Sequence, residues 1–163
     1  MDESVASFRL SKARQAGEIA AAAVLFREYA DWLGIDLSFQ GFEAELRDLP
    51  GKYAPPAGEL LLAHSADGNV LGCVALRPLD GIAVCEMKRL YVRPSARGLG
   101  AGRALITAII RSAQEIGYAE MRLDTLPMMA EAFALYQRVG FVEIPAYYHN
   151  PVPGTRYLGK RLA

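Results

Sequence analysis

The segment that decides the fold is residues 90–103, which read Leu90-Tyr91-Val92-Arg93-Pro94-Ser95-Ala96-Arg97-Gly98-Leu99-Gly100-Ala101-Gly102-Arg103. A strand-like apolar run enters a loop with alternate glycines, and an amphipathic helical pattern begins directly after it. Glycine lets the backbone approach a ligand closely and turn its N–H groups inward. A helix N-terminus adds unpaired N–H donors and a partial positive charge. With an arginine at each end of the loop, this segment predicts a binding site for a pyrophosphate.

Two well-known classes of phosphate-binding loop fit this segment less well. A dinucleotide-binding loop of the G-x-G-x-x-G type would have its third glycine at position 103, where the chain has Arg103. A P-loop needs lysine followed by serine or threonine at the start of the helix, and this helix start has no such pair. A turn without a ligand stays open, but it needs fewer glycines and leaves Arg97 without a role.

The elements around the loop predict one mixed sheet. The pattern predicts strands over 7–13, 59–64, 70–77, 82–92, 120–125, 141–144 and 155–160, and helices over 17–33, 41–49, from the glycine loop to 116, and 127–139. Hairpins followed by a β-α-β crossover are typical of an α/β protein of the α+β type, with a mostly antiparallel central sheet and helices on both faces. No repeat or linker interrupts the sequence, so we expect a single domain over residues 1–163.

The composition excludes several classes of protein. The 163 residues include 18 basic and 18 acidic side chains, and 52% are hydrophobic. This balance disfavours a nucleic-acid binder, and the apolar content disfavours a disordered chain. No apolar run approaches the roughly 18–20 residues of a membrane span, and Asp2 and Glu3 stand where a signal peptide would be basic. We therefore expect a cytoplasmic protein that binds neither membranes nor nucleic acid.

The zero net charge hides two segments of opposite sign. Residues 84–111 carry six basic residues against Glu86, and residues 28–50 carry six acidic residues against Arg47. The first segment suits an anionic ligand, and the second suggests a cationic one.

The two cysteines are predicted to be reduced. If Asp80-Gly81 is a two-residue hairpin turn, Cys85 lies opposite Leu76 and Cys73 lies opposite Lys88. The thiols are then three pairs apart, roughly 10 Å, which is beyond disulfide reach. Two histidines and two cysteines are too scattered to form a metal site, so we expect no metal.

Two separated motifs resemble one protein family. Arg97, Gly100 and Gly102 match the R/Q-x-x-G-x-G/A signature of the GNAT N-acetyltransferases. Residues 86–94 resemble the fourth strand of that family, and residues 136–141 (Tyr-Gln-Arg-Val-Gly-Phe) are similar to its Y-x-x-x-G-F element. The resemblance is most specific over residues 82–143. It implies a GNAT-like acyl-CoA N-acyltransferase fold, acetyl-coenzyme A (acetyl-CoA) as co-substrate, and direct acetyl transfer to a primary amine of a small molecule or peptide.

The resemblance also implies where acetyl-CoA binds. The fourth and fifth strands splay apart in such proteins, so that backbone groups of Leu90 and Val92 hold the pantetheine, with the Leu90 N–H near the thioester oxygen. The cofactor-binding residues implied in this way are Leu90, Tyr91, Val92, Arg97, Gly98, Leu99, Gly100, Ala101, Gly102, Arg103 and Tyr136. The chain departs from the pattern at Met129, where many relatives have an asparagine that touches the coenzyme.

Amide formation from a thioester needs three groups: a base for the amine, a donor for the oxyanion, and a proton for the leaving thiolate. Tyr136 resembles the family tyrosine that serves the thiolate, although a phenol on such a helix is also common in cores. Glu86 is the candidate base, acting through water, because strand alternation puts Glu86, Lys88, Leu90 and Val92 on one face. The alternative for Glu86 is a surface carboxylate paired with Lys88 or Arg89.

The acceptor is weakly marked in the sequence. Tyr29, Trp32 and Tyr147 are candidate substrate contacts, with core packing as their alternative, and His149 either lines the mouth or lies in a surface loop. The acidic segment 28–50 suggests a cationic amine. A coenzyme A-binding module without activity stays open, and Arg103 disfavours a nucleotide-dependent oxidoreductase. A homodimer is common in proteins that look like this one, but no residue demands it.

Overall fold

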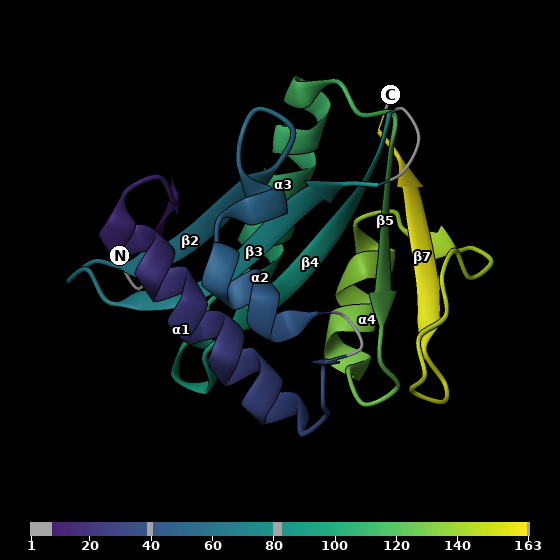
Figure 1. The fold of residues 1–163 in the computed structure, drawn as a ribbon, viewed down its shortest axis with the longest axis horizontal. Helices are drawn as coiled ribbons and strands as arrows, with labels where there is room; N and C mark the ends of the chain where they lie inside the picture. The colour runs from purple at the N-terminus through teal and green to yellow at the C-terminus, as the bar shows by residue number, and fades with distance from the viewer. Residues whose placement is uncertain (1–7, 39–40, 80–82, 163) are drawn as a thin grey trace, which may run out of the picture.

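A computed structural model describes residues 8–38, 41–79 and 83–162. Its strands form one seven-stranded sheet in the order β1-β2-β3-β4-β5-β7-β6 (Figure 1). The strands are β1 (Phe8–Lys12), β2 (Glu59–Ser65), β3 (Val70–Pro78), β4 (Val84–Val92), β5 (Glu120–Thr125), β6 (Val142–Glu143) and β7 (Arg156–Arg161). Only β4 and β5 pair in parallel. The predicted mixed, mostly antiparallel sheet is confirmed.

Helices cover both faces of the sheet, as predicted. They are α1 (Ala16–Leu33), α2 (Phe42–Asp48), α3 (Ala101–Ile116) and α4 (Ala130–Arg138), with short 3-10 turns η2 (Gly51–Tyr53) and η3 (Pro94–Ala96). The first two α-helices pack on one face, and α3 and α4 pack on the other (Figure 1). Within the described ranges, no helix is long and apolar enough to cross a membrane.

The helix boundaries follow local signals in the sequence. Both α1 and α3 end at a glycine with left-handed backbone, Gly34 (φ 67°) and Gly117 (φ 112°), as the sequence predicts. The apolar stripe of α3 is buried against β2, β3 and β4. Helix α4 begins at Ala130, after the predicted start at Pro127, because residues 127 and 128 form a turn that leads into the N-cap at Met129.

The β3–β4 hairpin differs from its predicted register. Cys85 lies opposite Pro78, where the sequence pattern placed it opposite Leu76. The Leu79 N–H donates to the Val84 carbonyl at 3.0 Å, so the connection spans residues 80–83 and is longer than a two-residue turn. The predicted turn residues Asp80 and Gly81 lie outside the described residues. Both thiols are free and buried in the structure. Their reduced state in the protein stays a prediction.

A β-bulge in β4 changes which side chains share a face. Arg89 has φ 62° and, with Leu90, lies opposite the single residue Val74, so that Cys73 faces Tyr91 and not Lys88. After the bulge, Leu90 and Val92 pack on the α3 side of the sheet. Before it, Glu86 and Lys88 lie with residues of α2 on the other side. The prediction that these four β4 residues share one face is therefore wrong, because the extra residue reverses the alternation.

Strands β4 and β5 separate part-way along their length. Their pairing covers only Val84–Glu86 of β4 against Glu120–Arg122 of β5. Figure 1 shows the strands diverging from that point, with α4 behind the gap. The second half of β4 therefore presents a free backbone edge inside the molecule.

Candidate functional site

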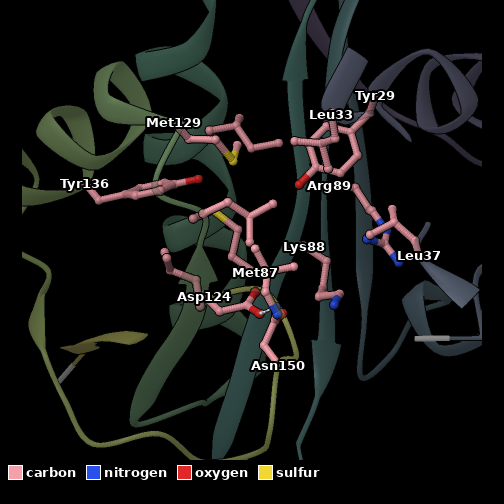
Figure 2. A pocket seen from close by; sticks show the side chains of 14 residues that line it. Tyr29, Leu33, Leu37, Met87, Lys88, Arg89, Asp124, Met129, Tyr136 and Asn150 are labelled. Atoms are coloured by element: carbon pink, nitrogen blue, oxygen red, sulfur yellow. Dashed lines mark hydrogen bonds between the residues drawn. The ribbon is translucent and has the colours of Figure 1, made fainter. Parts of the chain in front are cut away.

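The gap between β4 and β5 contains a narrow cavity, the central cleft. It is lined from α1, β4, β5, α4 and the loop between β6 and β7, and its volume is about 30 Å³ (Figure 2). Tyr136 and Tyr29 enter from opposite sides, with their hydroxyl groups directed inward (Figure 2). Lys88 and Asp124 line the end nearer to the β6–β7 loop. The splayed strands thus bring together side chains that are far apart in the sequence.

Tyr136 supplies an available proton donor in the cleft. It lies on α4, its side chain packs edge-on against Phe141 at 5.9 Å between ring centroids, and it is only 4% exposed. Burial raises the pKa of this phenol, so it is neutral at physiological pH. Among the described residues, none forms a hydrogen bond with its hydroxyl group, which points into the cleft (Figure 2). An unpaired, protonated phenol suits a general acid.

The free edge of β4 offers backbone groups to an extended ligand. The Arg93 N–H donates to the Leu71 carbonyl at 2.8 Å. Because backbone groups alternate in direction along an antiparallel ladder, those of Val92 point away from β3. The Val92 carbonyl accepts a hydrogen bond there from Arg97 Nε at 3.0 Å. A strand-like ligand such as a pantetheine that pairs with this edge would share or displace the hydrogen bond from Arg97 to the Val92 carbonyl.

The glycine loop forms the cradle that the sequence predicts. Gly98 and Gly100 adopt left-handed backbone with φ of 88° and 86°, which L side chains rarely adopt. Gly100 caps α3, and the first i to i−4 bond of that helix runs from the Ala104 N–H to the Gly100 carbonyl. The preceding N–H groups of residues 101–103 lie before this ladder and are available to an anion. Leu99 and Arg103 are exposed around the cradle, and Ala101 is buried beneath it.

The basic and acidic segments of the sequence pair with each other. Arg93 Nη2 lies 2.7 Å from Glu28 Oε2, and Arg89 Nη2 lies 2.8 Å from Glu45 Oε1. Both arginines therefore bind α1 and α2 and do not face the glycine loop. Arg97 remains exposed beside the loop, its guanidinium 5.0 Å from the ring centroid of Trp32.

Glu86 is buried and does not lie on the central cleft. It is 1% exposed, and its two oxygens accept hydrogen bonds from Arg77 Nε at 2.8 Å and from the Tyr147 hydroxyl at 2.6 Å. Burial, followed by the neighbouring Glu86 charge, raises the pKa of Tyr147. The alternative of a surface carboxylate paired with Lys88 or Arg89 is wrong for Glu86.

Glu86 lines a second cavity, which we call the α2 pocket. This pocket lies between α2, η2, β3, β4 and Tyr148, and its volume is about 520 Å³. Lys88 lines both the α2 pocket and the central cleft, so the two cavities meet at this residue. The α2 pocket is thus much the larger of these two cavities.

The other predicted contacts are divided between the cavities and the protein core. Tyr29 lines the cleft, and burial raises its pKa to about 12. Trp32 lines neither cavity and is 45% exposed. The side chain of Tyr91 packs toward α1 and donates to Glu28 at 3.4 Å, so only its backbone is near the cleft edge. Met129 lines the cleft, and His149 is exposed.

The sequence pattern did not reveal Asp124. This β5 residue lines the cleft, and its Oδ2 accepts hydrogen bonds from the Tyr148 hydroxyl and from Asn150 Nδ2. A carboxylate near the carboxyl end of a predicted strand was the available signal. Its partners lie 24 and 26 residues later in the chain, and no local pattern connects them.

Across the described residues, no cluster of three or more histidine, cysteine, aspartate or glutamate side chains could hold a metal ion. The β4 edge at Leu90 and the hydroxyl group of Tyr136 lie on the central cleft, and the glycine loop follows at the far end of β4, beyond η3.

Comparison with known proteins identifies this arrangement. A model of the acetyltransferase (GNAT) family matches residues 23–141. The chain belongs to the GNAT acetyltransferase family. An uncharacterized N-acetyltransferase from Schizosaccharomyces pombe is 45% identical over 135 residues, which cover 83% of this chain and 83% of that protein.

Solved GNAT structures share the fold. A GNAT-family acetyltransferase from Staphylococcus aureus has a TM-score of 0.79 at 20% identity, with 96% of this chain and 100% of that chain covered. The yncA protein of Salmonella typhimurium, solved with its cofactor acetyl-CoA, has a TM-score of 0.66 at 20% identity and covers 96% and 95% of the two chains. The protein is thus an acetyl-CoA-dependent acetyltransferase with a GNAT fold.

Proposed function

We propose that the protein transfers the acetyl group of acetyl-CoA directly to a primary amine of a small molecule or peptide. The observation that supports this most is the unpaired hydroxyl group of Tyr136, directed into the cleft where β4 leaves β5. In this proposal, the N–H groups of residues 98–103 bind the pyrophosphate, and the β4 edge at Leu90 and Val92 binds the pantetheine. Arg97 lies beside the phosphates.

The proposed reaction assigns one role to each group around the cleft. A neutral amine attacks the thioester carbonyl, and the Leu90 N–H stabilises the oxyanion that forms. When the carbon–sulfur bond breaks, Tyr136 donates its proton to the leaving thiolate. Tyr29 lies across the cleft from Tyr136 and contacts the acetyl group or the acceptor.

Removal of the amine proton is assigned to Glu86, acting through water. Both Glu86 oxygens already accept hydrogen bonds, so direct contact with the amine would displace Tyr147 or Arg77. The α2 pocket that Glu86 lines meets the cleft at Lys88. A water in this pocket would connect the amine to the carboxylate, with Tyr147 holding the carboxylate in place.

Thiol release from acetyl-CoA across a panel of amines tests the proposal, with mass spectrometry to detect the N-acetyl product. We expect amine-dependent thiol release and an acetylated amine in equal amounts. Binding of acetyl-CoA without turnover on any amine would contradict acetyl transfer and favour a coenzyme-binding module. Thermal shift with acetyl-CoA alone provides the binding control.

A further inference from the structure

We infer that the acceptor amine also carries a carboxylate, which the α2 pocket binds through Arg77 with Lys52 at its rim. The inference rests on the proposed acetyl transfer and names the class of its acceptor. It differs from the cationic acceptor suggested by the acidic segment 28–50.

The position and size of the α2 pocket suit a small acceptor. Its volume of about 520 Å³ lies within the range of roughly 300–1,000 Å³ of small-molecule sites. Lys88 lines both this pocket and the central cleft, so the two cavities adjoin at this residue. In this inference, the ligand held in the pocket extends its amine past Lys88 toward the cleft.

Two carboxylates that line the pocket, Glu45 and Glu86, already accept hydrogen bonds from arginines. Glu45 accepts from Arg89 Nε at 2.9 Å and from Arg89 Nη2 at 2.8 Å, which is a bidentate pair. Glu86 uses one oxygen for Arg77 and the other for Tyr147. These ion pairs neutralise the acidic residues that would otherwise attract a purely cationic amine.

Arg77, in contrast, keeps donors for a ligand. It uses Nε for Glu86, and no residue in the described part of the chain accepts a hydrogen bond from its two terminal nitrogens. Its side chain lines the pocket and is 27% exposed. A guanidinium has five N–H donors in a planar fork that matches a carboxylate. Lys52 adds a second cation at the rim, where Asp48 is exposed and its charge is screened by solvent.

A negatively charged residue lies on the central cleft, where the inference places the amine of the acceptor. Asp124 lines the cleft, and its Oδ2 accepts both hydrogen bonds from the β6–β7 loop, from Tyr148 and Asn150. In the described ranges, its Oδ1 has no hydrogen-bond partner. This oxygen can receive the ammonium group of an acceptor whose carboxylate lies at Arg77. A cation at Arg77 and a carboxylate at Asp124 together favour an acceptor that carries both a carboxylate and an amine.

Matched pairs of acceptors test the inference. L-leucine and L-phenylalanine are each compared with the corresponding amino acid amide and with the amine that lacks the carboxylate. A comparison of Gly-Phe with Gly-Phe amide then distinguishes a peptide C-terminus from a free amino acid. The amino acid amide loses its ammonium proton more readily than the amino acid does, so more of the amide is present as the reactive neutral amine. This difference by itself favours the amide, which is the opposite of the expected result. We expect kcat/KM to be at least about tenfold higher for the carboxylate member, as for a charged hydrogen bond.

Two variants locate the carboxylate site. Arg77→Lys keeps a positive charge beside Glu86 but loses the forked donors. Lys52→Gln changes an exposed residue at the rim, whose side chain has no hydrogen bond or ion pair with another described residue. Both should reduce the preference for the carboxylate several-fold while leaving acetyl-CoA affinity unchanged. Arg27→Gln, in an exposed pair with Glu43 outside both cavities, is the matched control and should preserve the preference.

The outcomes separate this inference from the proposed function. Equal or better turnover of the amides and simple amines overturns the carboxylate site and leaves acetyl transfer standing. Unchanged preference in both variants also overturns it. The absence of thiol release with every pair, while other amines are acetylated, overturns the carboxylate site alone. The absence of thiol release with any amine contradicts both proposals.

Discussion

Replacing Tyr136 with phenylalanine separates catalysis from folding and from coenzyme binding. The substitution removes one hydroxyl group and keeps the ring that packs against Phe141. Because no described residue shares a hydrogen bond with that hydroxyl, its loss leaves no buried group unpaired. We therefore expect the free energy of unfolding to change by less than about 1 kcal/mol.

The expected loss of activity is much larger. A positioned general acid contributes about 10²–10⁴-fold to a rate, which corresponds to roughly 2.7–5.4 kcal/mol of transition-state stabilisation. A hydrogen bond from Tyr136 to the coenzyme in the ground state is worth only about 0.5–1.5 kcal/mol, or up to about tenfold in affinity. Tyr136→Phe should thus lower kcat far more than it weakens acetyl-CoA binding.

The assay is thiol release for kcat and isothermal titration calorimetry for acetyl-CoA affinity. Tyr118→Phe is the matched control, because its hydroxyl bonds the Ala57 carbonyl at 2.7 Å, outside both cavities. The control should retain full activity. A kcat for Tyr136→Phe within twofold of the wild type would refute the assignment of Tyr136 as general acid.

Three further predictions concern the loop, the thiols and the pH profile. Gly100→Ala places a side chain at φ 86° and should lower the free energy of unfolding by about 1–2 kcal/mol, measured as a lower Tm. In the control Gly102→Ala, the added Cβ meets only ordinary contacts at 3.7 Å, so this variant should keep its Tm. Equal Tm values for the two variants would contradict the strain argument. Burial raises the pKa of the Cys85 thiol to about 12 and also raises the pKa of the Cys73 thiol. Neither thiol should therefore react with Ellman's reagent at pH 8 until guanidinium unfolds the chain. Fast labelling of the native protein would contradict this prediction, because it would show that the thiols are accessible. Burial also raises the pKa of Tyr136 above its usual range, so the phenol stays protonated in mildly alkaline solution and kcat should not fall between pH 7 and pH 9. An alkaline decline centred below pH 9 would argue against its role as the acid.

Local signals in the sequence predicted the parts of the fold that depend on neighbouring residues. The glycines at 98 and 100 adopt the left-handed backbone that marks the loop, and Gly34 and Gly117 end their helices as expected. The position of Tyr136 beside the cleft followed from the family resemblance and agrees with the structure.

The errors arise where the fold depends on distant residues. The bulge at Arg89 has no local mark, because a positive φ at arginine is imposed by the packing around it, including its bidentate pair with Glu45. Without the bulge, strand alternation placed Glu86 on the wrong face. The pairing of Glu86 with Tyr147 spans 61 residues, and no periodicity could show it. The opposite charges of residues 28–50 and 84–111 likewise pair with each other across the fold, which the sequence does not show.

Hydrogen–deuterium exchange of the full chain, with and without acetyl-CoA, tests most directly whether this cleft binds the coenzyme. We predict slower exchange over residues 97–103 and 88–92, where the loop and the free edge of β4 lie. Residues 156–161 of β7, already paired with β5, serve as an internal reference and should not change. Unchanged exchange over residues 97–103 at saturating acetyl-CoA would contradict binding of the coenzyme in this cleft.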